Sequence, residues 1–444
     1  MDVAFSRSET PTYVQDVLAS NSTDVAQWVS NGAAVYVCGS VEMGKSVKEF
    51  FSELTTPHKP LAYFDHMFTT AYKFVRFEKS KSMCILTAII ISIYLIGIEL
   101  GMFFYLANLI GGLVGNANPD YAQVFVVNRQ TENANQLSPF DVRWINQLRS
   151  IEGVDDTHGF VITPVTVKFP NGKDAPAMIV GSAYPALAAG PSSGLIESGS
   201  LHDLAAPEIV STDYYDNKAL RYEVQRGTRF EINGKAATVG VTTRHAKGFN
   251  APLLYTTLDK ARYYSGLSET MVSGIIVTVR NPEVIEPVVR RINRTAPDLK
   301  AWPAEVLRTG TIVNVMTANN MGMSFATLVI FGIISGFFII GLTMYSATYD
   351  RIKDYGTLKA IGASGRYITS LVVAQSLIYA VTGFLVSLLL LLISKIGMAK
   401  AGLIISLSPP LLTFLFLMTL LISVGSSYFS INKLRKVEPS SVFR

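Results

Sequence analysis

The sequence predicts a polytopic α-helical membrane protein, with four transmembrane helices and a large α+β extracytoplasmic domain between the first and the second helix. Three observations support this prediction. Charged residues make up only 16% of the chain, whereas soluble chains carry about a quarter. Four stretches reach the roughly 20 apolar residues that cross a bilayer. A long polar segment with strand-like and helix-like patterns separates the first two stretches.

The apolar stretches set the predicted order of domains. We place the transmembrane helices at 83–112, 323–345, 368–393 and 403–430. The remaining segments are a cytoplasmic fragment at 1–60, a basic membrane-proximal segment at 61–82, the extracytoplasmic domain at 113–322, a cytoplasmic coupling loop at 346–367 and a cytoplasmic tail at 431–444.

Basic residues predict the orientation of the spans. Cytoplasmic loops carry an excess of Lys and Arg close to the membrane. Both termini and the coupling loop are therefore expected inside the cell, and 113–322 outside it. The net charge of +5 is too small to indicate nucleic acid as a partner. The basic residues near the span ends are Lys73, Arg76, Lys79, Lys81, Arg351, Lys353, Lys359, Arg366, Lys433, Arg435, Lys436 and Arg444.

The segment 113–322 has the pattern of a folded domain. Strands are predicted at 123–128, 160–167, 177–180, 229–232, 237–243, 253–255 and 274–279, because these runs are rich in β-branched and aromatic residues. Asn233 and Gly234 indicate a hairpin turn. Helices are predicted at 139–149, 257–264 and 282–295, with Ser138 and Asn281 as N-caps. The segment contains no cysteine, so a disulfide framework is not expected.

Two polar side chains interrupt the apolar stretches. A carboxyl group such as that of Glu99 is costly inside a membrane, so it is usually paired or functional. Two interpretations of Glu99 stay open: a hydrogen bond across a dimer or helix interface, or contact with water near the outer end of the span. Gln375 is expected to form hydrogen bonds between helices.

The coupling loop carries a specific motif. The stretch 345–366 reads YSATYDRIKDYGTLKAIGASGR and is short, basic and amphipathic. It resembles the loop of the ABC permease family that includes MacB, FtsX, LolC/LolE and DevC. The residues that match are Arg351, Asp354, Gly356, Leu358, Lys359, Ala360, Ile361, Gly362, Ala363 and Ser364, with Asp354 in place of the usual Glu.

Other parts of the chain support the same resemblance. The predicted topology matches that family, whose members have one span, then a large external domain, then three further spans. Residues 227–240 resemble a strand pair of the family's external domain, and the tail has its basic stretch followed by Pro439 and a final Phe443-Arg444. Residues 98–101 are similar to the DevC-type exporters.

The resemblance implies a function without catalysis in this chain. A separate ABC ATPase would dock on Arg351, Asp354, Gly356, Leu358, Lys359, Ile361 and Gly362. It would bind the ATP, so this chain is expected to need no cofactor or metal. The other implied partners are a second copy or a related permease, a periplasmic membrane-fusion adaptor, an outer-membrane channel and membrane lipid.

Within this family, two functions are distinguished. The favoured one is export of a substrate from the periplasm or the outer leaflet, in the inner (plasma) membrane. The alternative is an FtsX-like subunit that transmits a signal and activates an external cell-wall hydrolase.

The N-terminal fragment carries two nucleotide-related patterns. Residues 39–46 match the phosphate-binding pattern G-x-x-x-x-G-K-[ST]. We reject an ATPase, because too few residues precede the first span to form the sheet and the acidic Mg²⁺ partner. The fragment resembles the NADP-binding end of the ferredoxin-reductase and sulfite reductase flavoprotein family, through Ser6, Arg7, Tyr13, Gln15 and Cys38. It is truncated, so a membrane-bound NADPH reductase is the least favoured function.

Overall fold

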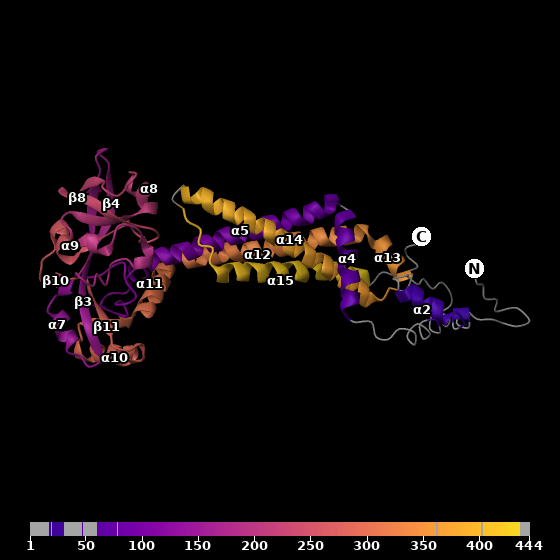
Figure 1. Ribbon diagram of the computed structural model, residues 1–444, viewed down its shortest axis with the longest axis horizontal. Helices are drawn as coiled ribbons and strands as arrows, with labels where there is room; N and C mark the ends of the chain where they lie inside the picture. Colours follow the sequence, from indigo (N-terminus) through magenta and orange to yellow (C-terminus); the bar gives the residue numbers. More distant parts are fainter. Residues whose placement is uncertain are drawn as a thin grey trace, which may run out of the picture. The chain divides into compact units, whose positions relative to one another are not determined.

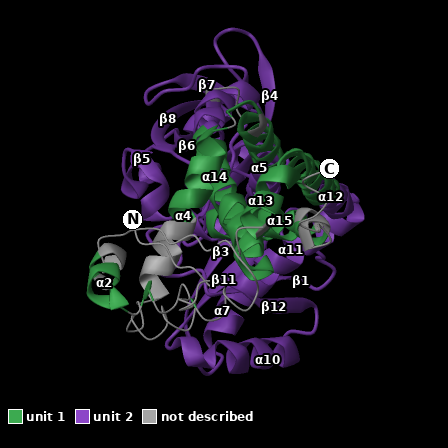
Figure 2. Ribbon diagram, turned by 90° about the vertical axis from the view of Figure 1, so that its right-hand side faces the viewer, with its two compact units in different colours: residues 1–95, 331–389, 412–444 green, residues 96–330, 390–411 purple. Residues whose placement is uncertain are grey.

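The computed structural model describes residues 17–18, 20–30, 47, 60–77, 79–360, 363–400 and 403–435. The chain forms two compact units, coloured separately in Figure 2. Unit 1 comprises 1–95, 331–389 and 412–444, and unit 2 comprises 96–330 and 390–411. The four candidate spans are Ser82–Ile110, Met321–Asp350, Gly365–Ala399 and Pro409–Tyr428, long and apolar enough to cross a membrane. The α+β domain lies between the first and second of them, so the predicted fold class is confirmed.

Unit 1 is a helical bundle. Its parts come from α4 (Pro60–Phe77), α5 (Lys79–Ile110), α12 (Met321–Asp350), α13 (Ile352–Ala360), α14 (Gly365–Lys400) and α15 (Pro409–Arg435). A short helix, α2 (Ser22–Ser30), precedes them.

Small residues let the helices of this bundle approach one another. A Cβ added to Gly336 of α12 would lie 3.1 Å from the Cβ of Ser92 of α5. A Cβ added to Gly383 of α14 would lie 2.5 Å from Ile89 of α5. Close approach over glycine is typical of helix packing in membranes, where van der Waals contact replaces the hydrophobic effect.

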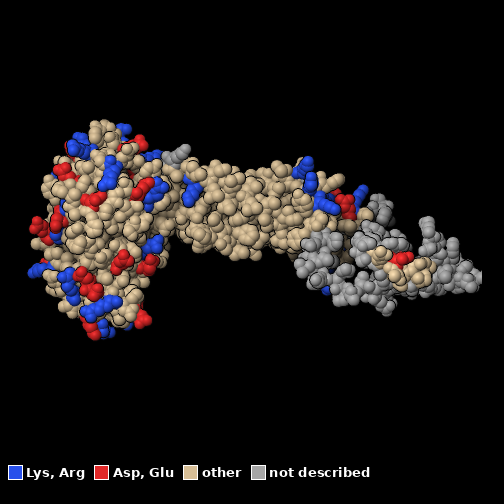
Figure 3. Space-filling view, in the orientation of Figure 1, with Lys and Arg blue, Asp and Glu red and all other residues tan. Residues whose placement is uncertain are grey.

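The helices also present apolar side chains outward. Phe331, Leu342 and Leu421 are 66–68% exposed. The face drawn in Figure 3 shows a long stretch of helical surface without Lys, Arg, Asp or Glu. Such a surface matches the hydrocarbon interior of a bilayer.

Unit 2 contains a mainly antiparallel sheet of ten strands. Its main path runs β12 (Leu299–Pro303), β1 (Val124–Asn128), β11 (Gly274–Val279), β3 (Val154–Lys168), β7 (Arg229–Ile232), β8 (Lys235–Thr243) and β5 (Ile196–Ser198). Beside it lie β4 (Asp174–Ser182), β9 (Leu253–Thr257) and β6 (Ile209–Asp213), and a separate pair is formed by β2 (Phe140–Asp141) and β10 (Met271–Val272). In Figures 1 and 2, β4 and β8 lie at one end of the domain and α10 (Ile285–Thr295) at the other.

The long strand β3 joins two core clusters of the domain, and a third cluster contains its residue Phe160. Its first half pairs with β11, and its second half pairs with β4 and β7. One core lies under α7 (Trp144–Arg149) and α10, and contains Leu148 and Ile292. The other lies under α8 (Asn217–Leu220) and α9 (Leu258–Ser265), and contains Ile179 and Tyr264.

Several local predictions are confirmed and one is wrong. Asn233 and Gly234 join β7 to β8 with φ angles of 49° and 76°, as the hairpin signal requires. The side chain of Asn281 accepts a hydrogen bond from the N–H of Glu283 at 3.2 Å and caps the turn before α10. Ser138 is not an N-cap, because Phe140 pairs with Val272 in a strand and α7 begins only at Trp144.

Several elements have no counterpart in the sequence prediction. Among them are the strands β5 and β6, and also α4, α11 (Ala304–Ala318) and β12. The last two lead from the domain into α12, within the segment predicted only as extracytoplasmic domain.

Candidate functional site: the coupling loop and its anchoring helix

The coupling loop folds mainly as the helix α13, directly after α12. Its outer face carries Lys353, Asp354 and Thr357, all exposed. Its inner face carries Tyr355 and Gly356, both buried. Leu358 packs partly buried against the bundle core. The loop therefore has one face available for a partner and one face fixed to unit 1.

Arg351 lies on the inner side and connects the loop to α4. One terminal NH₂ of its guanidinium donates a hydrogen bond to the backbone oxygen of Phe74 at 3.1 Å. The guanidinium carbon also lies 5.2 Å from the centre of the Phe74 ring, a cation–π distance. Only 7% of Arg351 is exposed. The residue predicted to contact an ATPase is thus held inside its own chain.

Tyr355 continues this connection into α14. Its ring stacks on Phe74 with the ring centres 6.1 Å apart. Its hydroxyl donates to Oε1 of Gln375 at 3.4 Å. Burial raises the pKa of Tyr355 above the usual value, although the bond to Gln375 opposes the shift. Gln375 is buried in α14, and its Oε1 atom accepts this hydrogen bond from α13.

A second polar contact joins the start of α5 to α14. The hydroxyl of Ser82 lies 2.8 Å from that of Tyr379 and donates to the backbone oxygen of Val75 at 2.7 Å. α4, α5, α13 and α14 are therefore linked by side-chain hydrogen bonds and ring contacts within a few turns of one another. These contacts connect α13 to the other three helices.

A cavity of about 260 Å³ opens beside the anchor. Its lining combines apolar rings with charges of both signs, which suits an amphipathic side chain of a partner protein. The lining residues are Lys73, Phe74, Phe77, Arg351 and Asp354.

The remaining predicted residues are placed as follows. Lys359 is half-buried at the end of α13. Ile361 and Gly362 lie outside the described residues, and so do Ser6, Arg7, Tyr13, Gln15, Cys38 and the segment 39–46. In the part of the chain that is described, no group of three or more His, Cys, Asp or Glu side chains could hold a metal ion.

Glu99 lies apart from this site, in unit 2. Its Oε2 atom is buried and has no hydrogen-bond partner among the described residues. On the same helix, Gly97 and Gly101 face Leu391 and Ile405, and the N–H of Ser406 donates to the oxygen of Gly101 at 3.1 Å. Both interpretations of Glu99 remain predictions.

Two residues of the site were not predicted from the sequence. Phe74 and Tyr355 form its centre, yet neither belongs to the charged pattern of the loop. A usable signal was present, since Phe74 and Tyr355 are aromatic residues placed among basic residues at the membrane boundary.

The part of the chain that contains the coupling loop is similar to a known protein family. Residues 326–439 match the family described as FtsX-like permease C-terminal, a range that includes the coupling loop and three of the four spans. This part of the chain is therefore similar to the FtsX-like permease C-terminal family. Together with the four apolar helices and the inserted α+β domain, the match confirms the resemblance to ABC transporter permeases of the MacB/FtsX type.

Two solved structures show limited similarity to this chain. The extracellular domain of the ABC-type transporter YknZ from Gram-positive bacteria is 13% identical, with a TM-score of 0.31, over 41% of this chain and 98% of that one. The periplasmic region of MacB from Actinobacillus actinomycetemcomitans is 13% identical, with a TM-score of 0.33, over 44% and 94% of the two chains. No curated protein matches the sequence.

The family that residues 326–439 match has two general properties. Permeases of this family are generally non-catalytic and pair with an ABC ATPase in a partner subunit. The four apolar helices and the family match indicate a multi-pass protein of the inner membrane.

Proposed function

We propose that this chain is the permease subunit of an ABC-type export complex. It transmits the ATP-driven conformational changes of a separate ATPase to its α+β domain. The ATPase docks on the exposed face of α13 and on the cavity beside Phe74. The substrate is taken from the periplasm or the outer leaflet, on the side of the α+β domain. The chain itself binds no nucleotide and no other cofactor.

The anchoring of Arg351 carries this proposal. A loop that only joined two spans would need no buried guanidinium, since desolvating a charge is costly unless it is well paired. Here the cost is met by the Phe74 oxygen and ring, and the result is a stiff connection between α13 and α4. A stiff connection is what a docking element needs to move several helices together.

The proposed orientation follows from charge. Lys73, Arg76 and Lys79 before the first span and Lys353 and Arg366 around α13 satisfy the positive-inside rule if α13 faces the cytoplasm. The ATP supply is on that side. The α+β domain then lies outside, where a permease of this type would act on its substrate.

Export is favoured over activation of an external hydrolase by the size of the domain. It spans the sequence between α5 and α12 and contains a ten-stranded sheet with several core clusters. A large folded domain offers surface for a substrate and for an adaptor protein. We place a second copy or a related permease beside the chain, because membrane permeases of this architecture act in pairs.

Cross-linking tests the docking face. A photoreactive amino acid is placed at Thr357, which is exposed on α13, in the full-length chain in its native membranes. We expect a covalent adduct with an ABC ATPase, identified by mass spectrometry. The matched control is the same probe at Thr166, which is exposed on β3 of the α+β domain.

A charge reversal provides a second readout. Asp354→Lys changes an exposed side chain and should reduce recovery of the ATPase with the tagged chain, while membrane yield stays the same. Lys168→Glu, on the α+β domain, should leave recovery unchanged. An adduct at Thr166 but not at Thr357 would refute the docking assignment and the orientation.

A further inference from the structure

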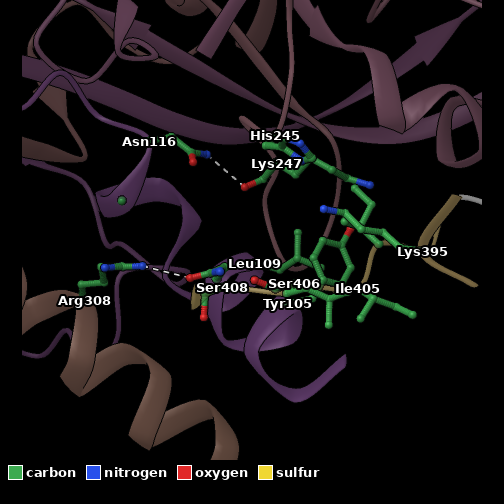
Figure 4. Close-up of a pocket in the computed structure, with 14 residues that line it drawn as sticks. Tyr105, Leu109, Asn116, His245, Lys247, Arg308, Lys395, Ile405, Ser406 and Ser408 are labelled. Atoms are coloured by element: carbon green, nitrogen blue, oxygen red, sulfur yellow. Dashed lines mark hydrogen bonds between the residues drawn. The ribbon is translucent and has the colours of Figure 1, made fainter. Parts of the chain in front are cut away.

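A cavity of about 350 Å³ lies within unit 2, where the α+β domain meets the ends of two spans. The last turns of α5 and α6 (Gly112–Gly115), the loop at 245–247, α11 and the segment 404–408 surround it. Figure 4 shows its side chains. In that view Arg308 lies on one side, and His245, Lys247 and Lys395 lie on the other, with Tyr105, Ser406 and Ser408 between them.

Among the described residues, the cavity is lined by three basic side chains and no carboxylate, although the buried Asp216 pairs with one of the three, Lys247. The cations are Lys247, Arg308 and Lys395. His245 adds no charge near neutral pH, because burial lowers its pKa below the usual value. A cluster of positive charge around a hollow attracts an anion strongly, since the low-dielectric walls weaken the charges less than water would.

Lys247 is held in place by the domain. Its ammonium nitrogen lies 3.1 Å from Oδ1 of Asp216 and donates to the oxygen of Tyr215 at 3.2 Å. Asn116 donates to the backbone oxygen of Lys247 at 3.0 Å. Burial lowers the pKa of Lys247, but Asp216 and Tyr105 raise it by more, so the side chain stays charged.

Arg308 has capacity left for a ligand. Its terminal NH₂ donates to Oδ1 of Asn108 at 3.0 Å, and its ion pair with Glu305 is long, at 3.6 Å, and mostly exposed on the Glu305 side. Its Nε is buried and has no hydrogen-bond partner in the described part of the chain. The side chain fits because Gly111 and Gly115 lack a Cβ, which would lie 2.9 Å and 3.1 Å from Arg308 atoms. A buried N–H without an acceptor is costly, so an anion at this point would be stabilising.

Lys395 and an apolar rim complete the site. Lys395 is exposed near the end of α14 and forms no ion pair within the described residues. Leu109, Ile404, Ile405 and Leu407 line the same cavity. The lining therefore combines groups that suit a charged headgroup with groups that suit a hydrocarbon chain.

We propose that this pocket binds the phosphate headgroup of an anionic lipid from the leaflet next to the α+β domain. The phosphate accepts hydrogen bonds from Arg308 and Lys395, within the field of Lys247. The acyl chains leave along the apolar ends of α5 and α14. A phosphate diester on a membrane lipid fits the combined polar and apolar lining, whereas a free phosphate would use only its polar part.

The test measures lipid binding by the full-length purified chain without any ATPase, so its result is independent of the proposed function. Native mass spectrometry is used to compare phosphatidylglycerol, phosphatidylcholine and inorganic phosphate. We expect phosphatidylglycerol to bind about tenfold more tightly than phosphatidylcholine. Both lipids carry the phosphate, but the quaternary ammonium of choline is repelled by the basic lining of the cavity, and tenfold corresponds to about 1.4 kcal/mol.

Variants locate the site. Arg308→Gln and Lys395→Gln each should remove that preference, and Lys168→Gln, an exposed lysine elsewhere in the domain, should retain it. Thermal unfolding of each variant checks that the domain is intact, and Lys395→Arg should restore the preference. Equal binding of the two lipids, or a preference unchanged in both Gln variants, would overturn the proposal. Binding of inorganic phosphate as tight as that of phosphatidylglycerol would also overturn it, in favour of a soluble anion.

Discussion

Arg351→Ala is expected to free α4 from the coupling loop. The substitution removes a buried hydrogen bond from a charged donor at 3.1 Å and a cation–π contact at 5.2 Å. A hydrogen bond to a charged group contributes about 1.5–3 kcal/mol, and a desolvated cation–π contact about 2 kcal/mol. The two share one side chain and do not add fully, so we expect the opening of α4 to become about 2–3 kcal/mol easier.

Hydrogen exchange in lipid nanodiscs measures this opening directly. Exchange from locally opened states follows the opening free energy, and about 1.4 kcal/mol corresponds to a factor of ten. Backbone amides at 68–77 should therefore exchange roughly 30- to 150-fold faster in the variant than in the native chain. Lys353→Ala removes one positive charge from the exposed face of α13, two residues after Arg351, and should leave exchange at 68–77 unchanged.

Two results of the exchange measurement would contradict an anchoring role for Arg351. If exchange at 68–77 were the same in Arg351→Ala and in the native chain, the guanidinium would not hold α4. If Lys353→Ala accelerated exchange equally, the effect would come from net charge rather than from the buried contact.

Three further predictions concern unit 2. Gly101→Val should destabilise the packing of α5 by about 1–3 kcal/mol through overpacking, since a Cβ at this position meets the side chain of Ile405; thermal unfolding in detergent measures the loss. Glu99→Leu should lower the dimer fraction in single-molecule photobleaching, if the buried oxygen of Glu99 is bonded to a second copy. Burial raises the pKa of Asp216 to about 6, so this group should make the domain less stable as pH rises from about 4 to 6, and Asp216→Asn should remove that slope from unfolding followed by tryptophan fluorescence.

Each of these has a contradicting result. If Gly101→Ser lowered the thermal stability more than Gly101→Val does, overpacking would be excluded as the cause. An unchanged dimer fraction in Glu99→Leu would favour contact with water over the interface. For Asp216, the folded state binds more protons than the unfolded state between the two pKa values, so a stability that rises with pH after subtraction of the Asn variant would contradict the assignment.

The elements predicted well from the sequence are those set by local chemistry. The turn at Asn233 and Gly234 needs positive φ, and these two residue types supply it. The Asn281 cap depends on a bond two residues away. The four spans follow from composition and length alone. None of these depends on distant parts of the chain.

The errors and omissions depend on long-range contacts. Ser138 is followed by a strand because Phe140 pairs with Val272, far along the sequence. The inward position of Arg351 depends on Phe74, 277 residues before it. A basic loop at a membrane boundary predicts charges in water, and the sequence alone does not indicate which one has an aromatic partner.

Under the proposed function, the strand β3 has a consequence for how the α+β domain would transmit force. Its 15 residues serve both cores, so the peptide backbone itself crosses from one to the other. Tension applied at one end of β3 is transmitted along its covalent backbone. The hydrogen bonds between β3 and its neighbouring strands resist sliding of the strands past one another. A domain built in this way would shift as one piece under a pull, and any bending within it would concentrate near Pro164, where the strand lacks a backbone donor.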